Sequence, residues 1–246
     1  MSVLQAEGLC KSYDGRCVVQ DISLALERGE LVSLLGVSGI GKTTLFNLLS
    51  GLECPDSGRV LLEGEDVTGH SGRVSYMQQK DLLLPFRTVL DNVCLPLRLA
   101  GAARREAHRR AGELMEEFGL GGSERRYPSE LSGGMRQRAA LLRAYLFSER
   151  VMLLDEPFSA LDAITKSSLH RWFQSVRKKH GTSSIFITHD IDEAIFLSDR
   201  VYIMSGAPGR ITAELQIELP GERDEDISMS DAFIHYKKQI LQEIRS

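Results

Sequence analysis

Apolar residues along the chain follow two kinds of spacing, and each spacing predicts its own kind of element. Short apolar runs, typical of strands buried in a sheet, recur along much of the chain. They cover Val18–Val19, Ile22–Leu26, Glu30–Leu35, Arg59–Glu63, Arg73–Met77, Val151–Leu154, Ser184–Thr188 and Arg200–Met204. Apolar residues at helical spacing instead predict helices over Thr44–Ser50, Arg105–Phe118 and Ile164–His180. Because strands and helices alternate in the second half, we expect a parallel sheet flanked by helices.

The middle of the chain and its tail depart from this alternation. Residues 87–130 are typical of a helical insert, and Gly119 is a suitable stop for the helix that ends at Phe118. The tail from Gly221 begins with acidic residues and ends in an expected amphipathic helix. The apolar residues of that last helix are Phe233, Ile240, Leu241 and Ile244. We find no internal repeat, so a duplicated architecture is not expected.

Composition narrows the class of protein without indicating one function. The chain has 246 residues, of which 42% are apolar and 26% charged, as in an ordinary soluble protein. A net charge of -4 offers no basic field for nucleic acid. No apolar stretch reaches the roughly 18 residues that cross a bilayer, and the N-terminus lacks the pattern of a secretory signal. The cysteines Cys10, Cys17, Cys54 and Cys94 form no C-x-x-C pair, so we expect reduced thiols and a cytosolic location.

The segment Gly36–Thr43 fits G-x-x-x-x-G-K-[ST], a loop that wraps phosphate groups. Its glycines, which let backbone N–H groups turn inward toward anionic oxygens, are Gly36, Gly39 and Gly41. Lys42 adds a charge near the outer phosphates, and Thr43 offers a hydroxyl to Mg2+. A predicted strand precedes the loop and a predicted helix follows it. This order places the phosphate at a helix N-terminus, where the helix dipole favours negative charge.

Two carboxylates end the apolar run Val151–Leu154. Asp155 can hold Mg2+ opposite Thr43, directly or through water. Glu156 points to the other side of the strand and is placed to accept a proton from an attacking water. Taken alone, acidic residues at a strand end are common and often structural. The phosphate loop upstream favours the catalytic interpretation.

A second helix start with free backbone amides is expected at Leu131–Gln137. Ser132 is a good N-cap there, and Gly133 and Gly134 expose N–H groups at the beginning of a helix that continues to Ala144. The structural alternative is an ordinary serine-capped helix with flexible glycines. That alternative does not explain why the motif lies shortly before the Asp-Glu strand.

Together these motifs resemble the ATP-binding subunit of an ABC transporter. Gly36–Thr43 is similar to the Walker A loop, Val151–Glu156 to the Walker B strand and Leu131–Gln137 to the signature motif. Further along, Ser159-Ala160-Leu161-Asp162 resembles the D-loop, and His189 in Ile187-Thr188-His189-Asp190 resembles the switch histidine. Tyr13 matches the aromatic residue that stacks on adenine. The match runs from about residue 4 to residue 211.

The resemblance implies an α/β fold with a P-loop NTPase (RecA-like) core, an N-terminal antiparallel β subdomain and an inserted helical subdomain. It implies one ABC ATPase domain over 1–246. Within it, residues 1–86 and 150–220 would form the β subdomain and core, 87–149 the helical subdomain with the signature motif, and 221–246 a helical tail.

The resemblance also implies the roles of individual residues toward ATP and Mg2+. The catalytic residues would be Lys42, Gln79, Glu156 and His189. The metal would be held by Thr43, Gln79 and Asp155. The nucleotide would be bound by Tyr13, Gly36, Ser38, Gly39, Gly41, Lys42, Thr43, Thr44, Ser132, Gly133, Gly134 and Asp162. Gln79 is chosen by its spacing from Leu84-Pro85-Phe86, and the neighbouring Gln78 remains the alternative.

One copy of each motif implies a dimer in which two chains sandwich ATP. The implied partners are a second copy or a paralogous subunit, transmembrane permease subunits and, indirectly, a solute-binding protein; nucleic acid is not expected. Asp81–Asn92 and Ser205–Ile211 resemble segments of nitrate, sulfonate, taurine and pyrimidine-precursor importers, which places the chain at the cytoplasmic face of the membrane. The competing class is a soluble ABC ATPase that acts on nucleic acid, ribosomes or cluster assembly.

Overall fold

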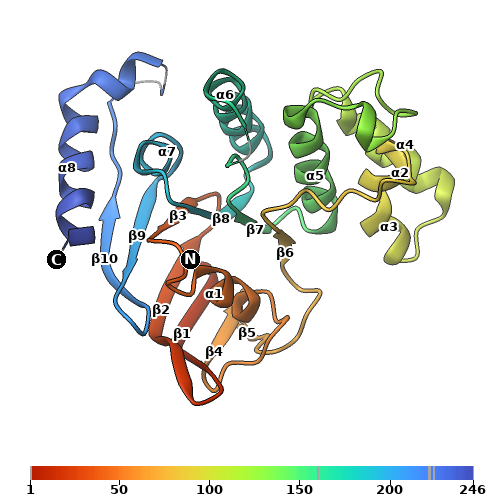
Figure 1. The fold of residues 1–246 in the computed structure, drawn as a ribbon. Helices are drawn as coiled ribbons and strands as arrows, with labels where there is room; N and C mark the ends of the chain where they lie inside the picture. Colours follow the sequence, from red (N-terminus) through yellow and green to blue (C-terminus); the bar gives the residue numbers. More distant parts are fainter. Residues whose placement is uncertain (1, 160, 221–222, 224, 246) are drawn as a thin grey trace.

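A computed structural model of the chain contains two sheets with helices around them (Figure 1). It describes residues 2–159, 161–220, 223 and 225–245. Ala160 of the predicted D-loop, and Gly221 at the start of the predicted tail, lie outside the described residues.

The first sheet is antiparallel and has the strand order β2-β1-β4-β5. Its strands are β1 (Ser2–Tyr13), β2 (Arg16–Glu27), β4 (Ser57–Leu62) and β5 (Glu65–Asp66). A two-residue turn joins β1 to β2, and both of its residues, Asp14 and Gly15, have positive φ, as a tight hairpin requires. The runs predicted separately at Val18–Val19 and Ile22–Leu26 belong to the single strand β2. The positive φ of Asp21 interrupts the alternation between them.

The second sheet has the order β10-β9-β3-β8-β7-β6, in which only the pairing of β10 with β9 is antiparallel. Its strands are β3 (Leu31–Leu35), β6 (Ser75–Met77), β7 (Val151–Asp155), β8 (Ser183–Thr188), β9 (Arg200–Ser205) and β10 (Arg210–Gln216). Every residue of β3, β7 and β8 is buried, which explains their continuous apolar character. The predicted parallel sheet is therefore present.

The helices form two groups (Figure 1). One group lies around the sheets and comprises α1 (Lys42–Leu49), α6 (Ala163–His180), α7 (Ile191–Leu197) and α8 (Asp231–Arg245). The other stands beside α6 and comprises α2 (Val89–Val93), α3 (Leu95–Leu99), α4 (Arg104–Met115) and α5 (Gly133–Phe147). Short 3-10 turns occur at Pro128–Glu130 and Glu225–Met229. Among the described residues, no helix has the length and apolar character needed to cross a bilayer.

Apolar side chains fill both faces of the second sheet. Leu153 and Ile185 face one core with Phe46 of α1, whereas their neighbours Leu154 and Phe186 face the core shared with α5 and α6. This alternation holds the central strands rigidly, because each fully buried side chain of this size contributes roughly 1.5–3 kcal/mol. The parallel strands β3, β7 and β8 consequently end at one fixed edge of the sheet, which is where ligands bind in open α/β folds.

Candidate active site

The loop Gly36–Thr43 connects β3 to the N-terminus of α1. Glycine is required at two of its positions by close contacts. A Cβ on Gly36 would lie 2.6 Å from the carbonyl oxygen of Met204, and one on Gly41, whose φ is 104°, would lie 2.6 Å from Val19. The loop is therefore pressed against its neighbours, and its backbone amides are held at the start of α1.

Lys42, the first residue of α1, is buried where the loop meets the helix. Its Nζ donates hydrogen bonds to the carbonyl oxygens of Gly36 (2.7 Å) and Val37 (2.9 Å). Burial lowers the pKa of Lys42, and the nearby charges of Glu156 and Asp155 oppose that shift. An anion bound in the loop would favour the charged form in the same way, so the site suits phosphate groups.

Asp155 lies at the end of β7 and faces Thr43. The Thr43 hydroxyl donates to Asp155 Oδ2 at 3.2 Å, and the Tyr76 hydroxyl donates to the same oxygen at 3.3 Å. Burial raises the pKa of Asp155. Burial also raises the pKa of Tyr76, which keeps that hydroxyl a neutral donor. Hydroxyl and carboxylate oxygens are ligands that Mg2+ prefers, so this pair fits the ion.

Glu156 follows Asp155 with a positive φ of 46°, an uncommon conformation for a residue with a side chain. Its carboxylate accepts a hydrogen bond from Gln79 Nε2 at 3.0 Å and lies 3.2 Å from His189 Nδ1. The structure thus brings three of the predicted catalytic residues together from β7, the end of β8 and the segment after β6. Gln78, the alternative to Gln79, lines a different cavity.

These residues surround one cavity of about 430 Å3. The predicted site residues along its wall are Ser38, Gly39, Gly41, Lys42, Thr43, Thr44, Gln79, Asp155, Glu156 and His189. Tyr13 lies at the end of β1 near Thr44, where it is 40% exposed and its hydroxyl donates to Glu53. The Lys11 ammonium lies over this ring, 5.6 Å from its centre, so a base that stacks on Tyr13 would share the ring with that cation or displace it.

The second helix start stands apart from this cavity. Ser132 caps α5 by accepting a hydrogen bond from the Met135 amide at 3.3 Å. Gly133 and Gly134 follow it, and the predicted Asp162 caps α6, accepting from the Thr165 amide at 3.0 Å. Among the described residues, the phosphate cavity is lined neither by residues 132–134 nor by Asp162. Within one chain these four predicted ligands are therefore not brought to the others.

Two features that sequence reasoning missed support the cavity from behind. Gly209 is buried against the phosphate loop, since a Cβ there would lie 2.2 Å from the carbonyl oxygen of Ile40. Its amide also donates to the Val18 carbonyl at 2.9 Å. The turn that resembles an importer segment thus has a structural role that only the fold reveals.

The other missed feature is a buried ionic network behind His189. Glu193 of α7 accepts a hydrogen bond from the Thr188 hydroxyl and lies 2.8 Å from His170 Nε2 of α6. Lys166 Nζ of α6 donates to Asp190 at 2.7 Å. The sequence signal was the spacing from His189 to Glu193, which places the carboxylate in the first turn of α7.

The family model described as ABC transporter matches residues 19–159, which is more than half of the chain. The chain belongs to the ABC transporter family. Its ATP-binding subunits hydrolyse ATP, and this chain is one of them. The predicted family, fold class and ATPase activity are confirmed.

Individual ABC relatives are similar over most of the chain. Formylaminopyrimidine import ATP-binding protein ThiZ of Halalkalibacterium halodurans is 45% identical over 81% of this chain and 78% of its own length. Taurine import ATP-binding protein TauB of Escherichia coli O157:H7 is 36% identical over 98% of this chain and 97% of its own length. The dimeric structure of the bacterial ABC transporter cassette MJ0796 superimposes with a TM-score of 0.76 at 26% identity, covering 87% of this chain and 99% of the cassette.

Proposed function

We propose that this chain is the ATP-hydrolysing subunit of an importer for a small solute of the nitrate, sulfonate, taurine or pyrimidine-precursor type. Two similar relatives are import subunits for taurine and for a formylaminopyrimidine. The segments Asp81–Asn92 and Ser205–Ile211 resemble the same group. In this proposal the chain works at the cytoplasmic face of the membrane, and a solute-binding protein acts on it only through the permease.

Within the site, each residue has a distinct proposed role. Lys42 and the loop amides bind the phosphates, and Thr43, Asp155 and Gln79 hold Mg2+, which supplies charge neutralisation when bound. Glu156 orients the attacking water and takes its proton, while His189 contacts the outer phosphate. The observation that carries these roles is the convergence of Gln79, Glu156 and His189 on the cavity that contains Lys42.

We propose that a second chain completes the site. The α5 N-terminus, with Ser132 and Gly134, offers backbone amides that are not used within its own chain's cavity. A dimer would place that helix end over the phosphates held by the partner. The similarity to a dimeric cassette supports this arrangement. In the same proposal residues 1–86 and 150–220 form the β subdomain and core, 87–149 the helical subdomain and 221–246 the tail.

A second cavity of about 440 Å3 supports a permease partner. It lies between the segment after β6 and the helices α3 and α5, and exposed apolar side chains line it. They are Leu52, Leu82, Leu99 and Phe147. An amphipathic helix of a membrane subunit would cover such a groove with its apolar face. Gln78 lines this second cavity, whereas Gln79 lines the phosphate cavity. The two cavities are therefore linked by adjacent residues of one segment.

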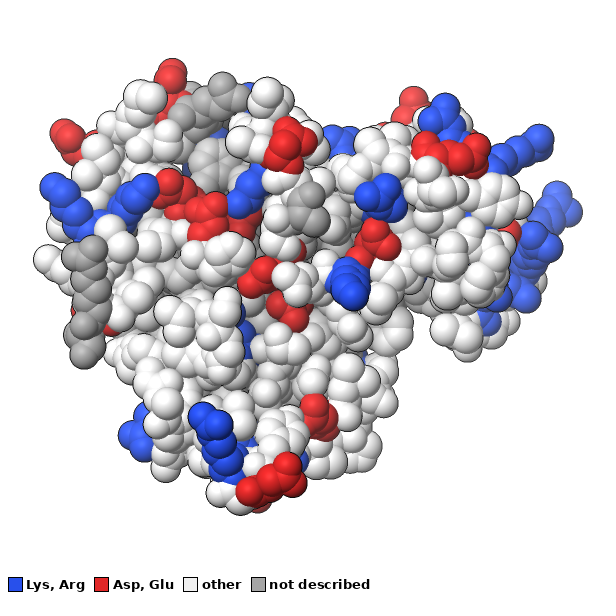
Figure 2. Space-filling view, viewed as in Figure 1, with Lys and Arg blue, Asp and Glu red and all other residues white. Residues whose placement is uncertain are grey.

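Retention of the permease pair in detergent tests this proposal. The chain is co-expressed and purified with candidate permease subunits. Leu99→Arg is expected to abolish their retention, because it charges the wall of the second cavity. Met229→Arg, at an equally exposed residue of the C-terminal region, is the matched control and should retain the pair. Enrichment of RNA or ribosomes in place of membrane subunits would overturn the proposal. Figure 2 shows Lys and Arg interspersed with Asp and Glu over most of the face drawn, with basic side chains gathered only at the right edge.

A further inference from the structure

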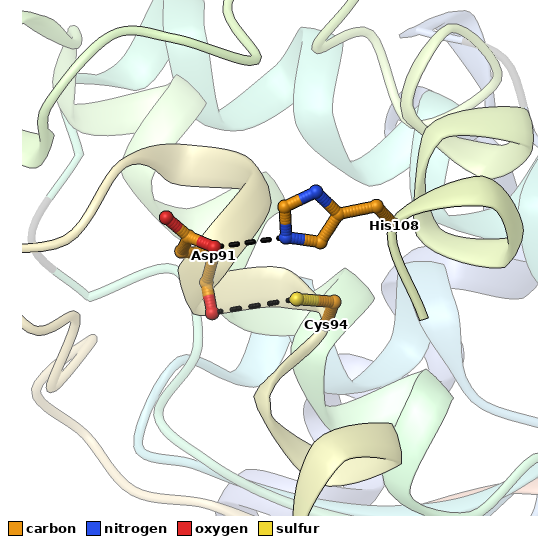
Figure 3. A group of neighbouring side chains, drawn as sticks. All are labelled: Asp91, Cys94 and His108. Atoms are coloured by element: carbon orange, nitrogen blue, oxygen red, sulfur yellow. Dashed lines mark hydrogen bonds and ion pairs between the residues drawn. The ribbon is translucent and has the colours of Figure 1, made fainter. Parts of the chain in front are cut away.

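A group of three potential metal ligands lies outside the phosphate cavity, in the helical part of the chain. Asp91 belongs to α2, Cys94 follows it, and His108 belongs to α4 (Figure 3). One ligand atom from each lies within 4.8 Å of the other two. In the part of the chain that the structure describes, no other His, Cys, Asp or Glu residues form such a group.

Local structure directs the three side chains to one point. Asp91 and Cys94 are three residues apart around the turn of α2, so they share a face. The Cys94 thiol is buried and lies 3.6 Å from the Asp91 carbonyl oxygen, to which it donates. Across from them, His108 Nε2 lies 2.9 Å from Asp91 Oδ1 (Figure 3). The site therefore ties α2 to α4.

We propose that Asp91, Cys94 and His108 bind a divalent transition-metal ion of the Zn2+ type. Sulfur, nitrogen and oxygen donors together suit a borderline-soft ion. Bond lengths of about 2.0–2.3 Å put tetrahedral ligand atoms about 3.3–3.8 Å apart. Binding would therefore widen the 2.9 Å between His108 Nε2 and Asp91 Oδ1 slightly and draw in any pair near the 4.8 Å limit of the group. An adjoining cavity of about 270 Å3 gives access to a fourth ligand. On binding, the thiol releases its proton and His108 keeps its proton on Nδ1.

The arginines around the cavity favour this ion over Mg2+. Arg87, Arg98 and Arg104 line the same space and would repel an uncompensated cation. A thiolate and a carboxylate together neutralise a divalent ion, whereas an ion held by Asp91 alone keeps a positive charge. Arg98 is already held by the Ala102 carbonyl at 2.6 Å. Arg104 Nη2 lies 3.4 Å from Asp91 Oδ1, so a bound ion must take the place of this contact, and the thiolate is needed to neutralise the ion.

Titration of the purified full-length chain with Co2+ tests the site, because a thiolate bound to Co2+ gives a charge-transfer band. We expect one Co2+ per chain with that band, its loss on adding Zn2+, and no change with excess Mg2+. Cys94→Ser should abolish the band, and His108→Ala should abolish stoichiometric binding. Cys17→Ser and His235→Ala, which alter a cysteine and a histidine elsewhere, should bind as the wild type does.

The proposal is overturned if Co2+ binds without a thiolate band or if Cys94→Ser binds equally well, since the metal is then adventitious. Cys94 is buried, so its variant is first checked for folding by circular dichroism. If that variant does not fold, His108→Ala decides the question, because this side chain is 28% exposed. Unchanged affinity in that variant overturns the site. None of the three residues lines the phosphate cavity, so the result is independent of the proposed transport function.

Discussion

The chain presents two helix N-termini with free amides, and they differ in what surrounds them. At α1 the phosphate loop is enclosed, with Lys42 buried and both Asp155 and Glu156 within its cavity. At α5 the amides follow an exposed Ser132, and no residue of that motif lines the cavity. In the proposed function the first terminus binds the phosphates beside the hydrolytic residues, whereas the second contributes binding alone.

This difference explains how closure between chains can control hydrolysis. A helix terminus contributes to phosphate binding through its amides and dipole only over a short distance. The exposed α5 terminus therefore acts on a nucleotide only when another molecule brings one to it. In the proposed dimer, one chain supplies the proton acceptor and the other supplies the second helix terminus, so we expect hydrolysis to require both chains.

The largest effect is expected from Glu156→Gln at the enclosed terminus. Loss of the proposed general base should lower ATP turnover by about 10²–10⁴-fold while nucleotide binding persists. Bound ATP should then hold two chains together, which size-exclusion chromatography with light scattering detects. Glu149→Gln, on the exposed surface, is the control and should leave turnover unchanged. Normal turnover in Glu156→Gln would remove Glu156 from the role of base.

A pair of variants can next distinguish the contribution of the α1 terminus from that of the α5 terminus. Lys42→Ala should lose nucleotide binding, measured by titration with a fluorescent ATP analogue. Ser132→Asp keeps a good helix cap but places a carboxylate toward the phosphates bound by the partner chain. ATP binding by a single chain should therefore persist, while ATP turnover should fall by about 10²-fold. Ser132→Asn caps α5 equally well without adding a charge, so its turnover should fall much less than that of Ser132→Asp.

Mixing the two variants gives the decisive comparison. A mixed dimer of Lys42→Ala and Ser132→Asp chains holds one site with both defects and one intact site. Turnover should therefore rise above that of either variant alone. Absence of any recovery, with both variants folded and able to exchange, would contradict a site shared between chains.

The enclosed terminus could be predicted from sequence because its chemistry lies in contiguous runs. Gly36–Thr43 and the Asp155-Glu156 pair each follow a buried strand, and parallel strands end at the same edge of a sheet. The family and fold followed from those runs. The assignment of roles to single residues stays a prediction, although the geometry brings Gln79 and not Gln78 to Glu156.

Supporting residues could not be predicted, because their partners are distant in sequence. Tyr76 binds Asp155 across 79 positions, and Gly209 presses on the loop at Ile40. Nothing in the local sequence around a tyrosine or a Pro-Gly turn indicates such contacts. These contacts become visible only in the folded structure. The same holds for the interruption of β2 at Asp21.

The two termini also differ in the ion pairs that lie near them. Lys166, behind His189, pairs with Asp190 and also lies 3.3 Å from Glu193, whose side chain is only 4% exposed. Arg136 and Asp81, beside the α5 terminus, are both part-exposed, lie 3.3 Å apart and have no such buried partner in this pair. Lys166→Met should lower the free energy of unfolding by roughly 1–3 kcal/mol, since it leaves buried carboxylates less well paired. Arg136→Met should cost about 1 kcal/mol or less. Urea denaturation measures both.

The pH dependence of that difference follows from the shifted pKa values. Burial raises the pKa of Asp190, but hydrogen bonds from Lys166 and α7 amides outweigh it and lower the pKa. Burial lowers the pKa of Lys166, but Asp190 and Glu193 outweigh it and raise the pKa. The pair therefore stabilises the fold at neutral pH and loses its effect as acid protonates Asp190 or as strong base deprotonates Lys166. An equal deficit of Lys166→Met at pH 7 and in acid would contradict this origin.

The smallest effect is expected at the rim of the enclosed terminus, where Tyr13 is proposed to stack on adenine. Its ring would supply the contact, so Tyr13→Ala should weaken ATP binding by about 1–3 kcal/mol, or about 5- to 150-fold. Tyr13→Phe keeps the ring and loses only the hydroxyl's interactions with Glu53 and Thr44, so affinity should stay within about 2-fold. GTP should respond to both substitutions in the same way, because every base offers a stacking face. If Tyr13→Phe weakens binding as much as Tyr13→Ala, the hydroxyl and its bond to Glu53 hold the site together, and the stacking role is wrong.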